Sequence, residues 1–160
     1  MAMTATTEEA LSELFETTIA SLTPRITYKG GEAWKPYKRE VANATTTRRF
    51  RLVWASGGIQ ERGAVGGGNV EMFAELRVRT DYAGSNDKTQ FIIVDDFIHL
   101  WQELSRLKAP PLNNGVVLVE GLRYEAAPQV DDSLEPPIDS NDVIKIDHVF
   151  RVRYMRRIDP

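Results

Sequence analysis

Arginines at alternating positions are the most unusual chemical feature of this sequence. Three stretches contain two arginines separated by a single apolar or aromatic residue: RRFRLVW (48–54), AELRVRTDY (74–82) and FRVRYMRR (150–157). Alternate side chains of a β-strand lie on the same face, so each stretch predicts a strand with one guanidinium-bearing face. A guanidinium pairs with both oxygens of a carboxylate or phosphate at once. The chemistry this pattern favours is therefore binding of an acidic group. The pairs are Arg49/Arg51, Arg77/Arg79 and Arg151/Arg153.

If the three strands are neighbours, six guanidinium groups share one surface, which requires acidic partners or bound anions because like charges repel across strands. Two interpretations stay open. In the first, the face is solvated and neutralised by local acids such as Glu75 and Asp147. In the second, it docks on another molecule, either duplex DNA or a second copy whose acidic 131–142 segment supplies the charge. The net charge of −3 favours protein over DNA.

Other candidate chemistry is weak. His99 lies in a predicted helix and His148 in a predicted strand, and the sequence places no nucleophile or third metal ligand beside either. Asp95 and Asp96 are adjacent on a predicted helix, so they do not face one another, and they fit a first-turn dipole role if that helix begins near them. The glycines of GAVGGGN (63–69) lead into a strand pattern without the GK[ST] of a phosphate loop. We expect no enzyme activity, no cofactor and no metal.

Composition sets the class of the protein. A chain of 160 residues with 42% hydrophobic residues is long enough for one packed domain. The charge balance is too even for a protein that coats nucleic acid. There is no cysteine, which excludes disulfides and thiolate sites. The N-terminus lacks the basic and apolar regions of a signal peptide, and the longest apolar run, FIIV at 91–94, is too short for a membrane span.

Two helices are predicted by periods of three and four. The first covers about Thr7 to Leu22, with Thr6 and Glu9 at capping-box spacing. The second covers about Gln90 to Leu107. Because it is apolar over more than half of its surface, we expect it to lie across the sheet as the most buried element.

Four strands are predicted at 48–54, 74–82, 115–126 and 143–156. The last would span on the order of 40 Å, so we expect part of it to project, bend at a bulge or pair with another chain. Three irregular segments complete the domain: an arm at 24–47 with one short strand at 25–29, a glycine-rich hairpin loop at 55–71, and an acidic, proline-rich loop at 127–142. In the arm, Trp34 and Tyr37 favour a surface contact.

These elements predict a single α+β domain over residues 1–160, with an antiparallel-rich sheet of about four strands and two helices packed on one face. Strand alternation directs one set of side chains toward the helices and the arginines away from them. That inward set is Phe50/Leu52/Trp54, Leu76/Val78/Thr80 and Phe150/Val152/Tyr154.

The layout resembles the tail-terminator and tail-completion proteins of long-tailed bacteriophages. In that group an RxF-type strand, an LxVRxxY-type strand and a final VxFxVxY strand recur, as in RRFRLVW, AELRVRTDY and FRVRY here. The likeness extends from Thr7 to Tyr154, without a counterpart for the 24–47 arm or the 127–142 loop. The resemblance implies a virion protein, assembled in the host cytoplasm, that forms a ring, typically a hexamer, on the tail tube. It would stop tube polymerisation and join head-completion proteins, with DNA only as cargo and without enzymatic activity.

A ring needs one surface that complements a different surface of the same chain, and the arginine face and the acidic loop meet that need. A head-closure or other neck protein is an alternative, followed by an anion- or nucleic-acid-binding module that uses the arginine face. The expected subunit contacts are Trp34, Tyr37, Arg49, Arg51, Gly66, Gly67, Gly68, Arg77, Arg79, Asp131, Asp132, Glu135, Arg151 and Arg153.

Overall fold

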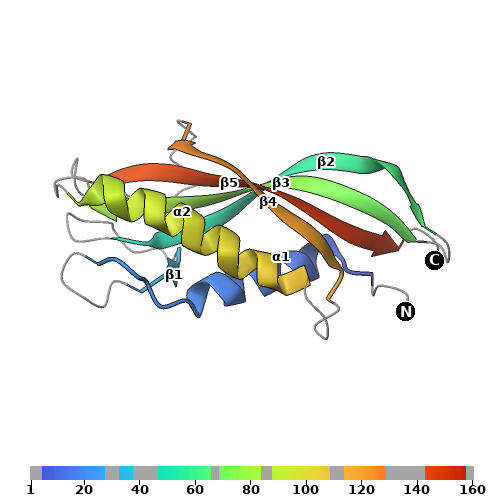
Figure 1. The fold of residues 1–160 in the computed structure, drawn as a ribbon, viewed down its shortest axis with the longest axis horizontal. Coiled ribbons are helices and arrows are strands. Elements are labelled where there is room, and N and C mark those ends of the chain that lie inside the picture. Colours follow the sequence, from blue (N-terminus) through green and yellow to red (C-terminus); the bar gives the residue numbers. More distant parts are fainter. Residues whose placement is uncertain are drawn as a thin grey trace.

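A computed structural model describes residues 5–27, 33–37, 47–65, 69–83, 88–108, 114–128 and 143–157. The chain forms one mixed α+β unit, a five-stranded sheet with two α-helices (Figure 1). The predicted fold class is confirmed. The elements are α1 (Glu8–Ala20), β1 (Lys35–Pro36), β2 (Arg49–Val65), β3 (Asn69–Ala83), α2 (Thr89–Ser105), a 3₁₀ turn η1 (Arg106–Lys108), β4 (Val116–Ala126) and β5 (Val143–Arg157).

The sheet has the strand order β1-β2-β3-β5-β4. Every pairing is antiparallel except the short β1–β2 contact, which is parallel and adds a fifth strand to the four expected. The long last strand is paired with β3 along its whole length, from Val143 opposite Ala83 to Arg157 opposite Asn69. The β2–β3 hairpin extends beyond both helices in Figure 1. The length of β5 is therefore accommodated within the chain, beside that hairpin.

The predicted hairpin loop at 55–71 is wrong over most of its range. Strand β2 continues to Val65 and β3 begins at Asn69. The ladder absorbs the glycines through register shifts at Ser56/Gly58 and Ile59/Ala64, which is how an extra residue is accommodated without ending a strand. Outside the described residues lie Gly66, Gly67 and Gly68, and also Asp131, Asp132 and Glu135 of the acidic loop.

Two further boundary predictions need correction. The described part of the predicted 25–29 strand is not a strand, and the arm instead pairs with the sheet at Lys35–Pro36. The cap of α1 is Thr7, whose hydroxyl accepts the Ala10 N–H at 3.1 Å, and not Thr6. Thr6 forms an isolated β-bridge with Arg156 instead.

Both helices pack on the same side of the sheet (Figure 1). The core lies between them and the strands, where Phe15 of α1 meets Trp54 of β2 edge to face and Phe97 of α2 stacks on Phe150 of β5. The predicted inward side chains of β2, β3 and β5 lie in this core or pack against it, except Thr80, which is buried and bonds the Val78 carbonyl. The exposure of α2 differs from expectation, because Trp101, Ile98 and Val94 are only partly covered.

Candidate functional site

The arginine face is built from basic and acidic residues on four neighbouring strands. In the register, Arg51 lies opposite Arg79, Arg79 opposite Asp147, and Asp147 opposite Glu125. One row away, Arg49 lies opposite Asp81, which lies opposite Lys145. The arginines predicted to share a face therefore do share it, together with acids from the same strands.

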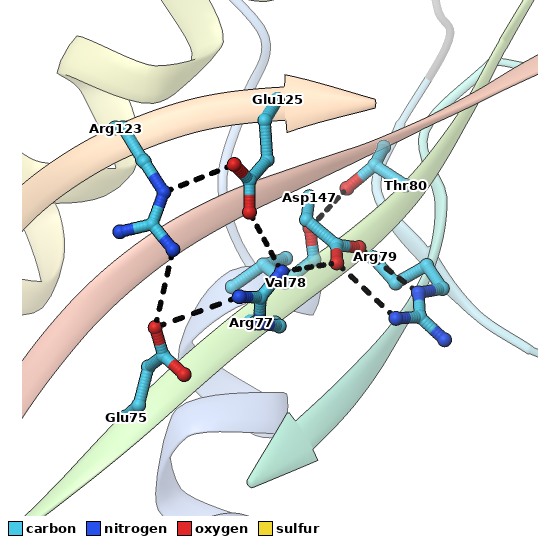
Figure 2. Close-up of polar contacts among 8 residues, drawn as sticks. All are labelled: Glu75, Arg77, Val78, Arg79, Thr80, Arg123, Glu125 and Asp147. Atoms are coloured by element: carbon cyan, nitrogen blue, oxygen red, sulfur yellow. Dashed lines mark hydrogen bonds and ion pairs between the residues drawn. The ribbon is translucent and has the colours of Figure 1, made fainter. Parts of the chain in front are cut away.

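Asp147 of β5 is the centre of this face (Figure 2). Its carboxylate accepts from Arg79 at two positions, Nε at 2.9 Å and Nη2 at 3.1 Å, and from Arg77 Nη1 at 3.1 Å. Asp147 is fully buried and Arg79 nearly so. A carboxylate shared between two guanidinium groups explains how Arg77 and Arg79 tolerate each other on one strand.

Toward β4 the network becomes more exposed, from 0% of the side chain at Asp147 to 21% at Arg77 and 46% at Arg123. Arg77 Nη1 lies 2.8 Å from Glu125, while Arg123 contacts Glu125 at 3.0 Å and Glu75 at 3.5 Å (Figure 2). Hydrogen bonds from Arg123 and Arg77 lower the pKa of the Glu125 carboxyl. Partial burial works against the charged form of Arg77, but its hydrogen bonds to Asp147 and Glu125 raise its pKa. The carboxylates hold this surface in its charged, paired state.

At the opposite side of the face, Tyr37 of the arm lies over a cluster of cations. The Tyr37 ring is 4.9 Å from the Arg49 guanidinium carbon and 5.2 Å from Lys145 Nζ, and its hydroxyl donates to Asp81 at 3.2 Å. Arg49 Nε bonds Asp81 at 2.8 Å, and the Arg51 guanidinium is 5.9 Å from the same ring. The arm residue Tyr37 therefore belongs to the arginine face.

The third arginine pair also contacts side chains of the sheet. Arg153 Nη2 bonds both oxygens of Glu71, at 2.8 and 3.0 Å. The Arg151 guanidinium lies 4.4 Å from the ring of Phe73, at cation–π distance. Local acids therefore neutralise four of these arginines, as in the first of the two interpretations of this face: Arg49, Arg77, Arg79 and Arg153. At these four arginines an incoming phosphate would have to displace a carboxylate from its guanidinium, so their geometry does not favour anion binding.

Trp34 is a correction to the predicted surface contact. It is 2% exposed, packs edge to face on Phe50 with ring centroids 5.9 Å apart, and lies 5.8 Å from the Arg48 guanidinium. Burial of this indole anchors the arm to the core instead of presenting it to a partner.

A second polar network, not predicted, lies on the helix side of the sheet. Arg48 is fully buried and binds Asp96 of α2 through Nε at 2.9 Å and Nη2 at 3.0 Å. The same guanidinium donates to the Ile26 carbonyl. Arg48 has a left-handed backbone, with φ 64°. Two backbone hydrogen bonds hold it there: the Arg48 N–H donates to the Asp81 carbonyl, and the Lys35 N–H donates to the Arg48 carbonyl. This costly conformation for a non-glycine residue turns the side chain inward.

Tyr82 and His148 extend this network. The Tyr82 hydroxyl donates to Asp96 Oδ2 at 2.8 Å and is 2.7 Å from His148 Nε2. Because the hydroxyl has one proton, His148 Nε2 must donate to it, leaving the buried Nδ1 without a partner. Burial lowers the pKa of His148 to about 3. Burial also raises the pKa of Asp96, against the opposing effect of Arg48.

The buried network joins the start of β2, the end of β3, β5 and the middle of α2. All four side chains, Arg48, Tyr82, Asp96 and His148, are 0% exposed. A substrate cannot reach them, so the arrangement serves as a cross-link and not as a catalytic site. Asp95, which precedes Asp96 in α2, binds Arg25 at 3.2 Å. Because α2 begins at Thr89, neither Asp95 nor Asp96 lies in its first turn, so neither has the predicted dipole role.

Strand parity was the available signal for this network. His148 has the parity of Phe150 and Tyr82 that of Val78, so alternation directs both polar side chains toward the helices. Arg48 precedes β2, and its left-handed backbone turns its side chain inward. Asp96 falls within the apolar stripe of α2. Polar groups on apolar faces, here Tyr82, Asp96 and His148, predict mutual pairing, because unpaired burial would be costly.

Other sites are sparse in the described part of the chain. A shallow hollow of about 250 Å³ beside the outer edge of β2 contains no convergent catalytic groups. No group of three His, Asp or Glu side chains among the described residues is arranged to hold a metal ion. No helix in the ranges described is long and apolar enough to cross a membrane. The hollow is lined by Ser12, Glu16, Tyr37, Phe50, Arg51 and Leu52.

Comparisons with known proteins add no assignment: no protein-family model, no curated protein and no solved structure matches this chain.

Proposed function

We propose that this chain is a structural protein of a bacteriophage virion. It forms a ring at the head-proximal end of the tail, ends polymerisation of the tail tube and joins the tail to the head. The supporting sequence argument is the resemblance to tail-terminator proteins. The supporting structural argument is an α+β sheet with two different open edges and no accessible catalytic constellation among the described residues.

The open edges are the observation that carries the proposal. At one side of the sheet, β1 pairs with β2 only at Arg49 and Phe50, and no described strand lies beside the rest of β2. At the other side, β4 is the terminal strand. Exposed edges are templates for pairing with another chain. Because the two edges differ and lie on opposite sides, their pairing is head-to-tail, the type of contact that closes rings.

The β4 edge is open over a limited length. Trp101 Nε1 and Ser105 Oγ of α2 both contact the Val119 carbonyl, at 3.2 and 3.4 Å, which occupies the middle of the edge. Nearer the strand end, the Ala127 N–H bonds Lys145 of β5. Since antiparallel strands alternate the direction of their peptide groups, those of Ala126 and Tyr124 point away from β5 and are placed to pair with a neighbour.

The experiment mixes the purified chain with polymerising tail-tube protein and measures tube length and end structure by electron microscopy. The wild-type chain should form rings at one tube end and shorten the tubes. Ala126→Pro should abolish both effects, because proline removes an outward N–H that makes no bond within the sheet. Ala126→Ser retains that N–H and serves as the matched control. Both variants should unfold at nearly the wild-type temperature.

The proposal is wrong if the wild-type chain neither binds tubes nor alters their length. A chain that forms rings but binds a head connector instead of tubes would be a head-closure protein, the alternative reading. An unchanged capping activity in Ala126→Pro would keep the function and remove β4 from the ring contact.

A further inference from the structure

An apolar stripe lies on the solvent-facing side of α2, beside the exposed Gln102 and its hydrogen bond from Arg25; a surface helix ordinarily presents polar residues there. Phe91 is 69% exposed, and Val94, Ile98 and Trp101 are 38–39% exposed. They follow one another at steps of three, four and three residues, so they form one stripe along the helix. The opposite side of α2 is already occupied, since Ile92, Ile93, Asp96, Leu100 and Leu104 face the core.

The stripe continues onto β4. Trp101 packs over Gly121 so closely that an added Cβ would lie 2.7 Å from the indole, and its Nε1 is fixed by the Val119 carbonyl. The Phe97 ring joins Trp101 to Tyr124, with centroids 6.1 and 5.7 Å apart. Tyr124 and Leu122 are themselves 40% and 45% exposed. Trp101 and Tyr124 are thus held in place. Together with the other exposed apolar residues of α2 and β4 they form what we call the α2–β4 apolar surface: Phe91, Val94, Ile98, Trp101, Leu122 and Tyr124.

Its area is in the range of a docking site. If a large aromatic side chain presents about 150–250 Å², the six exposed residues present on the order of 500 Å² of apolar surface. Isolated apolar patches beyond a few hundred Å² mark interaction sites. A stable complex buries about 800 Å² on each partner, so this surface together with its polar rim is sufficient for a dimer.

We propose that the α2–β4 apolar surface binds a second copy of this chain, with the two α2 helices antiparallel about a two-fold axis. The spacing of the stripe reads the same in both directions, with aromatic residues at its ends and aliphatic residues inside. An antiparallel pair centred at position 96 places Phe91 against the partner's Trp101 and Val94 against the partner's Ile98. Steps of three and four residues also form the seam of paired helices that cross at a small angle.

This inference does not rest on the proposed function. A two-fold contact joins the same patch on both copies and cannot by itself close a ring larger than two. Ring closure uses the sheet edges, whereas the helix pair links two protomers, or two rings, through their α2 sides. Each proposal can therefore fail without the other.

The first experiment measures self-association of the full chain by sedimentation equilibrium, without tube protein. We expect a dimer that dissociates on dilution. Ile98→Arg should raise the dissociation constant by about 100-fold or more, because each dimer would bury two unpaired guanidinium groups. Thr17→Arg is the matched control, since it adds the same charge to the exposed side of α1 and should leave the dimer intact. Circular dichroism checks that both variants are folded.

The second experiment tests the antiparallel geometry. The chain has no cysteine, so introduced thiols are unambiguous. Phe91→Cys mixed with Trp101→Cys should form disulfide-linked dimers on oxidation. Either variant alone should not, because like positions would lie about 15 Å apart along the helices at 1.5 Å per residue, beyond disulfide reach.

Three results would overturn the inference: a wild-type chain that stays monomeric at about 100 µM, a dimer unaffected by Ile98→Arg, or cross-linking of the single variants as efficient as that of the mixture. If the chain is monomeric and Ile98→Arg instead loses binding to tail tubes, the surface serves the tube and not a second copy. If the dimer forms as expected but tubes are ignored, the helix pairing stands and the proposed function fails.

Discussion

The two polar networks of this protein use the same arginine–carboxylate pairing on opposite faces of one sheet. On the arginine face, Asp147 is shared by Arg77 and Arg79, and the contacts continue through Glu125 to the more exposed Arg123. On the helix face, Arg48 and Asp96 form one bidentate pair that is fully enclosed. The first network is branched, and its side chains become more exposed toward Arg123. The second is a single chain of contacts without access to water.

The difference shows why position matters more than residue type. An exposed pair gains little, because water competes for both charges. A buried pair is costly to desolvate, and once formed it cannot lose one member cheaply. We therefore expect the arginine face to tolerate substitution at its rim and the Arg48 network to tolerate almost none.

The largest effect should come from Asp96→Ala. It leaves the Arg48 guanidinium buried without a counter-charge, which should lower the free energy of unfolding by about 3–5 kcal/mol. The double variant Arg48→Met/Asp96→Leu should recover much of that loss, because apolar groups then fill the space and Tyr82 can donate to His148. Chemical denaturation at pH 7 measures both; a double variant less stable than Asp96→Ala would contradict this account.

The second effect concerns pH. The unfolded His148 imidazole takes up a proton near its ordinary pKa of 6.5, but the folded one does so only near pH 3. Between these values the unfolded state binds more protons, so the free energy of unfolding falls as pH falls, by on the order of 4 kcal/mol in total. The raised pKa of Asp96 acts in the opposite direction.

His148→Gln isolates the histidine contribution, because its amide N–H can bond Tyr82 and does not titrate. Denaturation midpoints for both chains at pH 7, 5 and 4 give the difference in slope. The variant should lose stability less steeply on acidification. Parallel curves for the two chains would show that another group controls the acid response.

The smallest effects should separate the two ends of the arginine face. Asp147→Asn removes the charge shared by Arg77 and Arg79 at a buried position, and should cost about 2–3 kcal/mol. Arg123→Ala, at the exposed end, should leave the unfolding temperature unchanged within error. Thermal unfolding at low and high salt measures both. Equal losses of stability in the two variants would mean that the contribution of each residue does not depend on its burial.

Much of the fold was accessible from periodicity. Alternation placed Phe50, Phe150 and Val152 on the core side and the arginine pairs on the other, because strand geometry leaves no other choice. The glycines of β2 were misleading, since a local preference for turns was overridden by pairing with β3. Trp34 was misread for a similar reason: its burial depends on contact with Phe50, distant in the sequence.

The sequence by itself determined which strand faces carry charge, since parity is a local property of an extended chain. Which acid each arginine meets was decided only by the tertiary structure, because the register between β3 and β5 selects Asp147 for Arg77 and Arg79. The same is true of Arg48, whose left-handed backbone and contact with Asp96 exist only once α2 lies across the sheet. Long-range packing also decided that one side of α2 is covered while its Phe91–Trp101 stripe remains exposed, since the helix has apolar residues enough for both sides and the sheet covers one.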